Sequence, residues 1–343
     1  MAAKVTSAQV AQMAGVSQSA VSRVFTPGGS VSEKTARKVR SAAKALGYRP
    51  NVLARAVASG RSRIIGLVVA YLDNYFYPQA LEKLSKSLQA KGYHVLIFMT
   101  SQSANDLDNV VDEILDYQVD GIVFASVSMS SGIVESCHNA GVPVVLFNRR
   151  QDKLGVSAVT SDNFAGGRKI AEFFALAGHR RIGFISGWEG ASTQRDREAG
   201  FRAGLKTYGL ELVARGVGNY RTDQASEAAL KMFSAPASQR PDALFVANDY
   251  MAFAVLDALR ERLGLSVPND VAVVGYDDVP PASWAAYDLT TVRQRSNLMV
   301  EHTVDTLLAE IDAPSTFEPR QIAIDGPLIV RGSTRNPSDL PEI

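Results

Sequence analysis

Cysteine is nearly absent from this chain of 343 residues, which contains Cys137 alone. One cysteine cannot close an intrachain disulfide, so a disulfide-stapled fold is excluded and nothing indicates an oxidising compartment. The chain also lacks an apolar run of roughly 18 residues, the length that spans a membrane, and its first residues lack the apolar core of a signal peptide. We therefore expect a cytoplasmic protein without a membrane partner, in which Cys137 is a small buried hydrophobe.

Signals for metal, cofactor or catalytic chemistry are equally scarce. The sequence has no glycine-rich nucleotide motif after a strand and no GxSxG nucleophile elbow. Asp277 and Asp278 could act as an acid/base pair, but neighbours on a loop usually point apart, so ligand binding by one of them is the better interpretation. Without these motifs we predict no cofactor and no enzyme activity. We also predict no metal site, since the four histidines are far apart and lack partners at metal-ligand spacing. They are His94, His138, His179 and His302.

Charge is distributed unevenly, although the net charge of the whole chain is only +1. Residues 1–63 carry eleven lysines or arginines and one acidic residue, whereas residues 64–343 carry 25 basic and 34 acidic side chains. The chain is thus a head of net charge +10 joined to a body of net charge −9. A basic segment of this density attracts polyanions, which indicates a nucleic acid partner; a solvated charged face is the alternative.

Two short helical periods follow each other in the head between Val5 and Phe25. Ser7 is the expected N-cap of the first helix, Gly15 closes it, and Ser17 caps the second. A third helix is expected after Ser32, ending at Gly47, which completes a three-helix domain. Its apolar stripe consists of Ala36, Val39, Ala43 and Leu46.

The second helix carries the residues suited to reading DNA. Its apolar Ala20, Val21 and Val24 should face the core, which leaves a polar outward face. Amide and hydroxyl groups can pair with base edges in a major groove, and arginine can pair bidentately with guanine. A generic surface helix would explain the same outward residues about as well: Gln18, Ser19, Ser22 and Arg23.

The stretch after the third helix predicts a hinge. Asn51 can cap a short run of helix formers that ends at Gly60, too short to hold its helix alone. Its apolar Leu53 and Val57, with the basic Arg55, would suit a minor-groove wedge with phosphate contacts. We therefore expect a hinge helix that forms on a partner.

The body alternates apolar runs of strand length with amphipathic helical stretches, which is typical of parallel βαβ units. Eight such runs exceed one doubly wound sheet, so we expect two α/β lobes with a ligand cleft at the carboxyl ends of their strands. The segment 290–294, followed by a helix and two short strands, should return across the lobe boundary. The expected strands lie within 64–72, 94–99, 121–126, 142–147, 156–160, 181–186, 243–247 and 271–276.

The head resembles the DNA-binding head of the lactose-repressor (LacI/GalR) family in the block VTSAQVAQMAGVSQSAVSRVF, its spacing to VSEKTARKV and LGYRPN, and the run LARxxxSGRS. The resemblance implies base contacts by Gln18, Ser19 and Arg23. It also implies backbone or cap contacts and hinge contacts in the minor groove, where Val57 stands at the position of a wedging leucine. The residues implied are Thr6, Ser17, Ser22 and Asn51 for the backbone and Leu53, Arg55 and Val57 for the hinge.

The body resembles the effector domain of the same family, which shares its fold with periplasmic sugar-binding proteins, in segments such as STQRDREAGFRAGL, LFVANDYMAFAVLDALRERL and VAVVGYDDVPPASW. Asn148 departs from the acidic residue common at its position, and Arg149 stands beside it, so we hypothesise an acidic or phosphorylated effector. The effector-binding residues that the resemblance implies are Tyr77, Asn148, Arg195, Tyr220, Asn248 and Asp277.

The resulting prediction is an all-α helix-turn-helix head (1–48), a hinge (49–62) and a two-lobed α/β body (63–343). The N-lobe would comprise about 63–161 and 294–323, and the C-lobe about 162–292 and 324–343. We expect a repressor that binds a near-palindromic double-stranded operator as a homodimer under the control of a small sugar-like or sugar-acid effector. Induction and corepression both remain open, and the alternatives are an activator, a solute-binding protein or a sugar-converting enzyme.

Overall fold

The structure, a computed structural model, describes residues 5–26, 29–49, 61–100, 104–127, 129–151 and 155–335. These residues fall into two compact units, the head (Met1–Arg63) and the body (Ile64–Ile343). None of the helices in the described ranges is long and apolar enough to cross a membrane. The predicted hinge positions lie outside the described residues: Asn51, Leu53, Arg55 and Val57.

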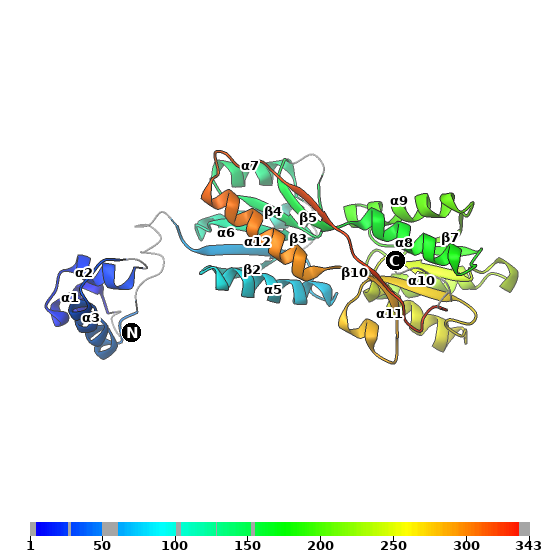
Figure 1. Cartoon of the computed structure of the whole chain (residues 1–343), viewed down its shortest axis with the longest axis horizontal. Coiled ribbons are helices and arrows are strands. Elements are labelled where there is room, and N and C mark those ends of the chain that lie inside the picture. The colour runs from blue at the N-terminus through cyan, green and yellow to red at the C-terminus, as the bar shows by residue number, and fades with distance from the viewer. Residues whose placement is uncertain are drawn as a thin grey trace. The chain divides into compact units, whose positions relative to one another are not determined.

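The head is the predicted helix-turn-helix domain (Figure 1). Its core forms where the apolar faces of the helices meet, and Val10, Val21 and Val39 are almost fully buried there. Val24 and Leu46 pack against this core from its edge. The helices are α1 (Ser7–Ala14), α2 (Gln18–Phe25) and α3 (Glu33–Leu46).

The caps that delimit these helices agree with the sequence in all but one case. Gly15 ends α1 with φ +66°, a left-handed conformation that glycine adopts without strain. Ser17 caps α2 as predicted. The prediction of Ser7 as the first N-cap is wrong, because the Thr6 side chain accepts from the Gln9 N–H and the Gln9 side chain accepts from the Thr6 N–H. This reciprocal capping box satisfies two N–H groups that the helix leaves unpaired.

The described part of the body forms two six-stranded sheets, one in each lobe. In the N-lobe the strand order is β11-β5-β4-β3-β1-β2, all parallel. These strands are β1 (Ile64–Val69), β2 (His94–Met99), β3 (Gly121–Ala125), β4 (Val144–Phe147), β5 (Ser157–Ser161) and β11 (Gln321–Ile324).

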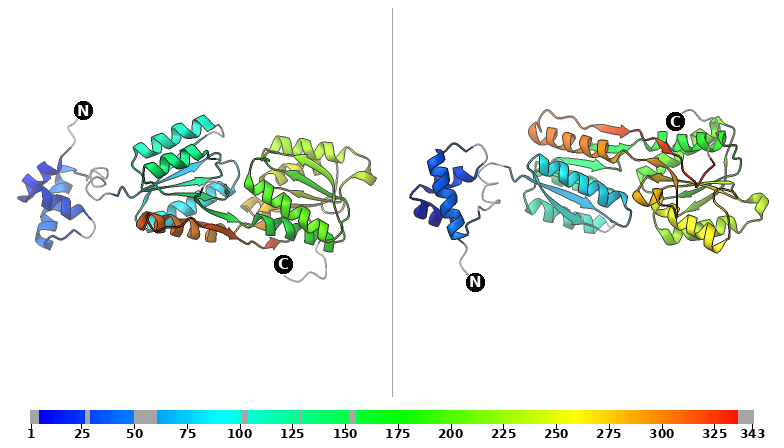
Figure 2. Two further views of the ribbon diagram at one scale, coloured as in Figure 1. Left: turned by 90° about the horizontal axis from the view of Figure 1, so that it is seen from above. Right: turned by 60° about the horizontal axis from the view of Figure 1, so that its bottom comes forward.

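The C-lobe sheet has the order β12-β10-β9-β8-β6-β7, and only the short β12 runs antiparallel to its neighbour. Its strands are β6 (Ile182–Ser186), β7 (Leu212–Val217), β8 (Ala243–Val246), β9 (Ala272–Asp277), β10 (Thr290–Arg293) and β12 (Leu328–Ile329). The chain passes between the sheets after β5, after β10 and after β11 (Figures 1 and 2).

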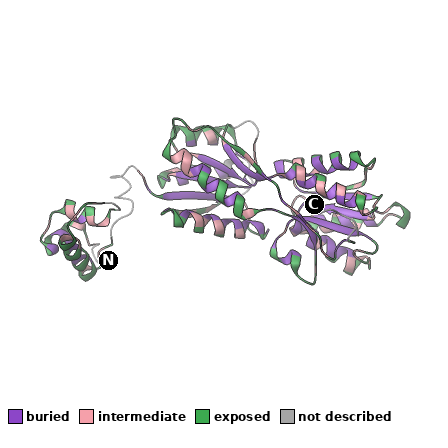
Figure 3. Ribbon diagram, viewed as in Figure 1, coloured by how far each residue is buried: buried purple, intermediate pink, exposed green. Residues whose placement is uncertain are grey.

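Helices cover both sheets, so the strands in the centre of each lobe are buried while the outer helix faces are exposed (Figure 3). In the N-lobe, the buried side chains of α5 and α12 belong to one core, whereas Leu107 of α6 and Cys137 of α7 belong to a second core. The body helices are α5 (Phe76–Ala90), α6 (Ala104–Asp116), α7 (Ser131–Asn139), α8 (Asn163–Leu176), α9 (Ser192–Thr207), α10 (Thr222–Phe233), α11 (Asp249–Asp257) and α12 (Ser296–Asp312).

Each apolar run named in the sequence forms a strand, and the expected return across the lobe boundary is present as β10, α12, β11 and β12. The strand that the sequence did not reveal is β7. It lies at an edge of its sheet, and its residues alternate between half-buried and exposed. It therefore lacks the continuous apolar run of a central parallel strand.

Candidate functional site

The head presents one exposed polar face on α2. Gln18, Ser19, Ser22 and Arg23 are all exposed, as the sequence predicted, while Val21 on the opposite side is buried. The Gln18 side-chain amide donates to the Ser7 hydroxyl across 2.8 Å, which joins the start of α2 to α1. This face leaves its amide, hydroxyl and guanidinium groups accessible for contacts with a large partner.

In the body, unusual backbone conformations gather at the carboxyl ends of the strands. Ser126 follows β3, Asn148 follows β4, Tyr220 follows β7 and Asp277 ends β9, and each has a positive φ between +59° and +131°. Non-glycine residues rarely adopt this region, and such strained residues concentrate at binding sites. The strain therefore marks the end of each sheet that lies toward the other lobe.

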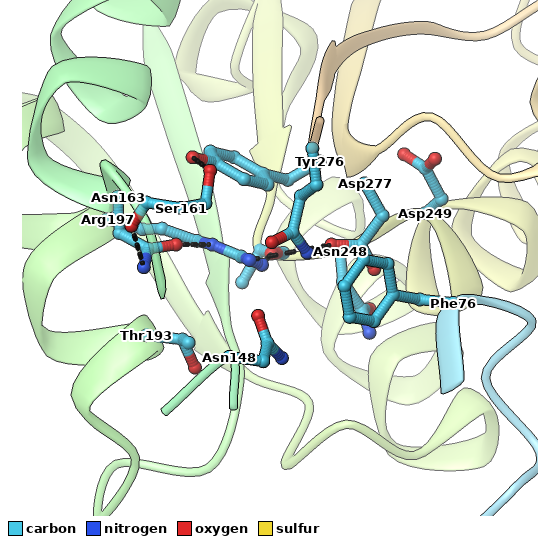
Figure 4. Close-up of polar contacts among 12 residues, drawn as sticks. Phe76, Asn148, Ser161, Asn163, Thr193, Arg197, Asn248, Asp249, Tyr276 and Asp277 are labelled. Atoms are coloured by element: carbon cyan, nitrogen blue, oxygen red, sulfur yellow. Dashed lines mark hydrogen bonds and ion pairs between the residues drawn. The ribbon is translucent and has the colours of Figure 1, made fainter. Parts of the chain in front are cut away.

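Polar and aromatic side chains from both lobes meet at these strand ends, and we call this set the interlobe cluster (Figure 4). They come from the carboxyl ends of eight strands, β1, β3, β4, β6, β7, β8, β9 and β10, since parallel strands all end at the same edge of a sheet. The N-lobe supplies Tyr71, Asn74, Tyr77, Ser126, Asn148 and Arg149, the C-lobe supplies Trp188, Thr193, Arg197, Tyr220, Asn248, Asp249 and Asp277, and the connection after β10 supplies Gln294.

Within the interlobe cluster, Asp277 links the two lobes. Its carboxylate accepts from the side-chain amide of Asn74 across 3.2 Å and from that of Gln294 across 2.6 Å. A third donor, the Arg197 guanidinium, lies 3.4 Å away. Burial raises the pKa of Asp277, whereas the charge of Arg197 and these hydrogen bonds lower it.

The prediction of Arg195 in this site is wrong. Arg195 is exposed and pairs with Asp196 across 2.8 Å, whereas Arg197, two residues further along α9, is buried in the cluster. Both arginines belong to the same motif, but residues two apart on a helix lie on different faces. The helical period of α9 was the signal that could have separated them, since the buried Phe201 and Arg197 are four residues apart.

Four contacts fix Arg197 in place. Its Nε donates to the Asn163 side-chain oxygen across 2.8 Å, its Nη1 donates to the carbonyl of Ala247, and its Nη2 faces Asp277. The ring of Tyr276 lies 3.7 Å from the guanidinium carbon, a cation–π contact. Figure 4 shows Arg197 held between Asn163 and Asp277.

Close packing of α8 against α9 makes this arrangement possible. A Cβ on Gly167 would lie 2.2 Å from the carbonyl oxygen of Arg197, and a Cβ on Gly200 would lie 2.0 Å from that of Phe164. Only glycine permits the two helices to approach so closely. The NFAGGRK and REAG segments thereby bring Asn163 and Arg197 within hydrogen-bond distance.

A second carboxyl group, Asp249, was not predicted. It is fully buried, accepting from the Thr291 hydroxyl across 2.6 Å and from the Val279 N–H across 3.0 Å. Burial, together with the nearby charge of Asp277, raises the pKa of Asp249 to about 8. The buried Asp249 carboxyl therefore holds its proton more tightly than an exposed aspartate does.

The other predicted effector residues do lie in the interlobe cluster. Tyr77 and Asn148 are buried and hydrogen-bonded to each other across 2.9 Å. Tyr220 bonds to the Thr193 hydroxyl across 3.0 Å. Asn248 is buried and caps α11, since its side-chain oxygen accepts from the Met251 N–H.

Four buried side-chain atoms in the described residues have no hydrogen-bond partner: Asn148 Oδ1, Arg149 Nε, Ser186 Oγ and Gln294 Oε1. All four belong to residues at the carboxyl end of β4, β6 or β10, where the lobes face each other. Buried polar groups are normally paired, and an exception calls for an explanation such as a bound molecule. In the same described ranges no group of three or more histidine, cysteine or acidic residues could hold a metal ion.

Comparison with known proteins decides the family. A sequence profile of bacterial regulatory proteins of the lacI family matches residues 8–51, and one of the periplasmic binding protein-like domain matches residues 171–334. The transcriptional regulator CelR of Thermobifida fusca is 33% identical over 338 residues, covering 94% of this chain and 96% of that protein. The chain belongs to the LacI family.

Two further relatives match this LacI-family protein over its length. The ribose operon repressor of Escherichia coli (strain K12) is 29% identical over 327 residues, which cover 94% of this chain and 98% of that protein. The crystal structure of the lac repressor dimer bound to operator and an anti-inducer superposes with a TM-score of 0.86 at 26% identity, covering 97% and 99% of the two chains. The LacI-family protein is thus a DNA-binding transcription regulator with the predicted fold, a helix-turn-helix head and a periplasmic-binding-protein-like body.

Proposed function

We propose that this regulator is a repressor that binds a near-palindromic operator as a homodimer and responds to a small polar effector bound in the interlobe cluster. The names of its relatives support this, since they include operon repressors and a repressor dimer bound to operator. In this proposal the cluster binds its effector and converts nothing, so turnover of a bound compound would count against it.

The exposed face of α2 carries the DNA-binding part of the proposal. Gln18, Ser19 and Arg23 read base edges in the major groove, and Thr6, Ser17 and Ser22 contact the backbone. The support is that these side chains are exposed on the helix-turn-helix domain of a strongly basic head. One such helix contacts few bases, so specific binding calls for two heads on a two-fold site.

The unpartnered polar atoms of the interlobe cluster support the proposal that an effector binds there. Tyr77, Asn148, Tyr220, Asn248 and Asp277 bind the effector, and Arg197 takes the place of Arg195. An effector that binds one arrangement of the lobes better than another shifts the population toward that arrangement and so changes operator affinity. Loss or gain of affinity on binding would distinguish induction from corepression.

We assign the edge strand β2 to the dimer interface. Ile97 and Met99, on one face of β2, are about half exposed, and Tyr117 beside the strand is also exposed. An apolar edge strand of this kind favours pairing with another chain. Sedimentation should show a dimer for the wild type and a shift toward monomer for Ile97→Asp, and an unchanged dimer would exclude this interface.

Selection of bound sequences from a random duplex pool tests the function as a whole. With the full-length wild-type protein we expect enrichment of one motif made of two inverted half-sites. Enrichment of a single half-site would remove the dimer from the proposal, and no enrichment over bulk DNA would remove sequence-specific binding.

A further inference from the structure

Arg149 is a buried cation that pairs with no carboxylate among the residues that the structure describes. Its side chain is 95% shielded from solvent, yet its hydrogen bonds go only to neutral oxygens: the Ser126 carbonyl at 2.9 Å and the Tyr71 hydroxyl at 3.2 Å. Its Nε donor has no partner. A buried guanidinium normally pairs with a carboxylate or a phosphate, because removing its charge from water is costly.

Within the described ranges, no acidic side chain forms an ion pair with Arg149. The rings of Trp188 and Tyr220, both from the C-lobe, lie 5.7 and 5.6 Å from its guanidinium carbon, so aromatic groups rather than acids flank it. The Asp277 carboxylate accepts from Arg197, Asn74 and Gln294 rather than from Arg149. Asp249 bonds to the Thr291 hydroxyl and the Val279 N–H, so it is not the counter-charge of Arg149 either.

Two of the other unpartnered atoms in the cluster are acceptors. Asn148 Oδ1 and Gln294 Oε1 are buried amide oxygens without a donor. The Asn148 amide nitrogen is already engaged by Tyr77 and Ser126, so its oxygen is the free end of that side chain. Amide oxygens without donors match ligand hydroxyl groups, which supply O–H donors.

From this arrangement we propose that the effector is a hydroxylated anion, a hydroxy carboxylate or a hydroxylated phosphate, whose anionic group binds Arg149 and whose hydroxyl groups bind Asn148 and Gln294. This inference rests on the proposed function, since it specifies the ligand of the same site. Arg149 supplies a planar fork of N–H donors, which suits the paired oxygens of either anion.

Calorimetry on the full-length protein with minimal compounds tests the assignment. The compounds are acetate and glycerate for the carboxylate arm, inorganic phosphate and glycerol 3-phosphate for the phosphate arm, and glycerol as the neutral partner, all at equal ionic strength. We expect the hydroxylated anion of one arm to bind more tightly than its simple anion, and both more tightly than glycerol. The arm with the tighter binding identifies the anionic group.

Arg149→Gln should weaken binding of that anion roughly 10- to 100-fold, the loss expected for a charge-assisted hydrogen-bond pair. The matched control is Arg202→Gln, a half-exposed arginine of α9 that pairs with Glu198 on the protein surface, and it should bind as the wild type does. If Arg149→Gln failed to fold, Arg149→Lys should still weaken binding, because lysine keeps the charge but loses the planar fork.

The proposal is overturned if the wild type binds none of the anions, if glycerol binds as tightly as glycerate or glycerol 3-phosphate, or if both Arg149 variants bind as the wild type does. These measurements involve no DNA, whereas the duplex selection involves no effector. Failure of the anion assignment can therefore be told apart from failure of the repressor function.

Discussion

The α2 face of the head and the interlobe cluster of the body are both polar, yet they are constructed in opposite ways. The α2 face consists of exposed side chains from one stretch of eight residues, and only a few local hydrogen bonds hold them. In the cluster, buried side chains as far apart in sequence as Asn74 and Asp277 contact each other. Exposed side chains remain accessible to a large, variable partner. Buried side chains are held in one arrangement that suits one small ligand.

Replacing the buried Asp277 of the interlobe cluster should have the largest effect. Asp277→Asn leaves Arg197 without its counter-charge and turns an amide N–H₂ toward other donors. We expect a loss of about 3 to 5 kcal/mol in the free energy of unfolding of the body. Urea unfolding followed by tryptophan fluorescence measures it, because both tryptophans, Trp188 and Trp284, lie in the body.

The matched control for this change is Asp223→Asn. Asp223 pairs with Arg221 across 2.9 Å, but both side chains are more than 60% exposed. Water and salt screen such a pair, so the unfolding midpoint should not change. Equal losses of unfolding free energy for Asp223→Asn and Asp277→Asn would show that the buried contacts of Asp277 stabilise the body no more than a surface ion pair does.

The next largest effect expected is the pH dependence of the free energy of unfolding of the body, which contains Asp249. Asp249 has a pKa of about 8 in the folded body and an ordinary value of 3.8. Since the folded state holds this proton more tightly, its contribution to stability is full at low pH and is lost as the pH rises toward 8. The free energy of unfolding should fall by about 2 kcal/mol between pH 6 and pH 8, since the slope of roughly 1.4 kcal/mol per unit for one proton halves as the pH reaches the pKa.

Asp249→Asn is the comparison for this measurement and should show a flatter pH profile from a lower starting stability. His179, whose pKa is lowered by burial, titrates in the opposite sense and is present in both proteins. Parallel profiles of wild type and variant would assign the pH dependence to other groups.

On the α2 face, Arg23→Ala should cost about 1 to 3 kcal/mol in operator binding and relax the preference at one base position. Because Arg23 is exposed, the stability of the head should hardly change. Competition binding against single-base operator variants measures both effects, with Arg202→Ala of the body as control. A uniform loss over all sequences would make Arg23 a phosphate contact rather than a base-reading residue.

The smallest effect concerns the start of the head. Thr6→Ala removes the N-cap of α1 and should lower local stability by about 1 kcal/mol. Ser7→Ala loses only the exposed contact with Gln18 and should have a smaller effect. Hydrogen exchange of peptides from residues 5–26 compares the two, and a larger effect for Ser7 would contradict the capping box.

The sequence alone predicted the elements that depend on neighbouring residues. The three head helices, their glycine ends and the outward face of α2 follow from local periodicity and capping, so they were assigned correctly apart from Thr6. The central strands were visible because strands buried on both faces are continuously apolar. The edge strand β7 was missed because one of its faces is exposed and its pattern is mixed.

The interlobe cluster could be predicted only in part. Asn148 and Asp277 directly follow apolar runs, where the sequence already indicated a ligand site, and Tyr77 was implied by the family resemblance. Which arginine of α9 is buried, that Asp249 lies beside Asp277, and that Arg149 bonds to neutral oxygens depend on contacts between residues far apart in the chain. Local sequence determines which chemical groups are available. The charge state of these groups, and which of their hydrogen-bond donors and acceptors stay unpaired, depend on burial and pairing, which are decided only when the two lobes come together.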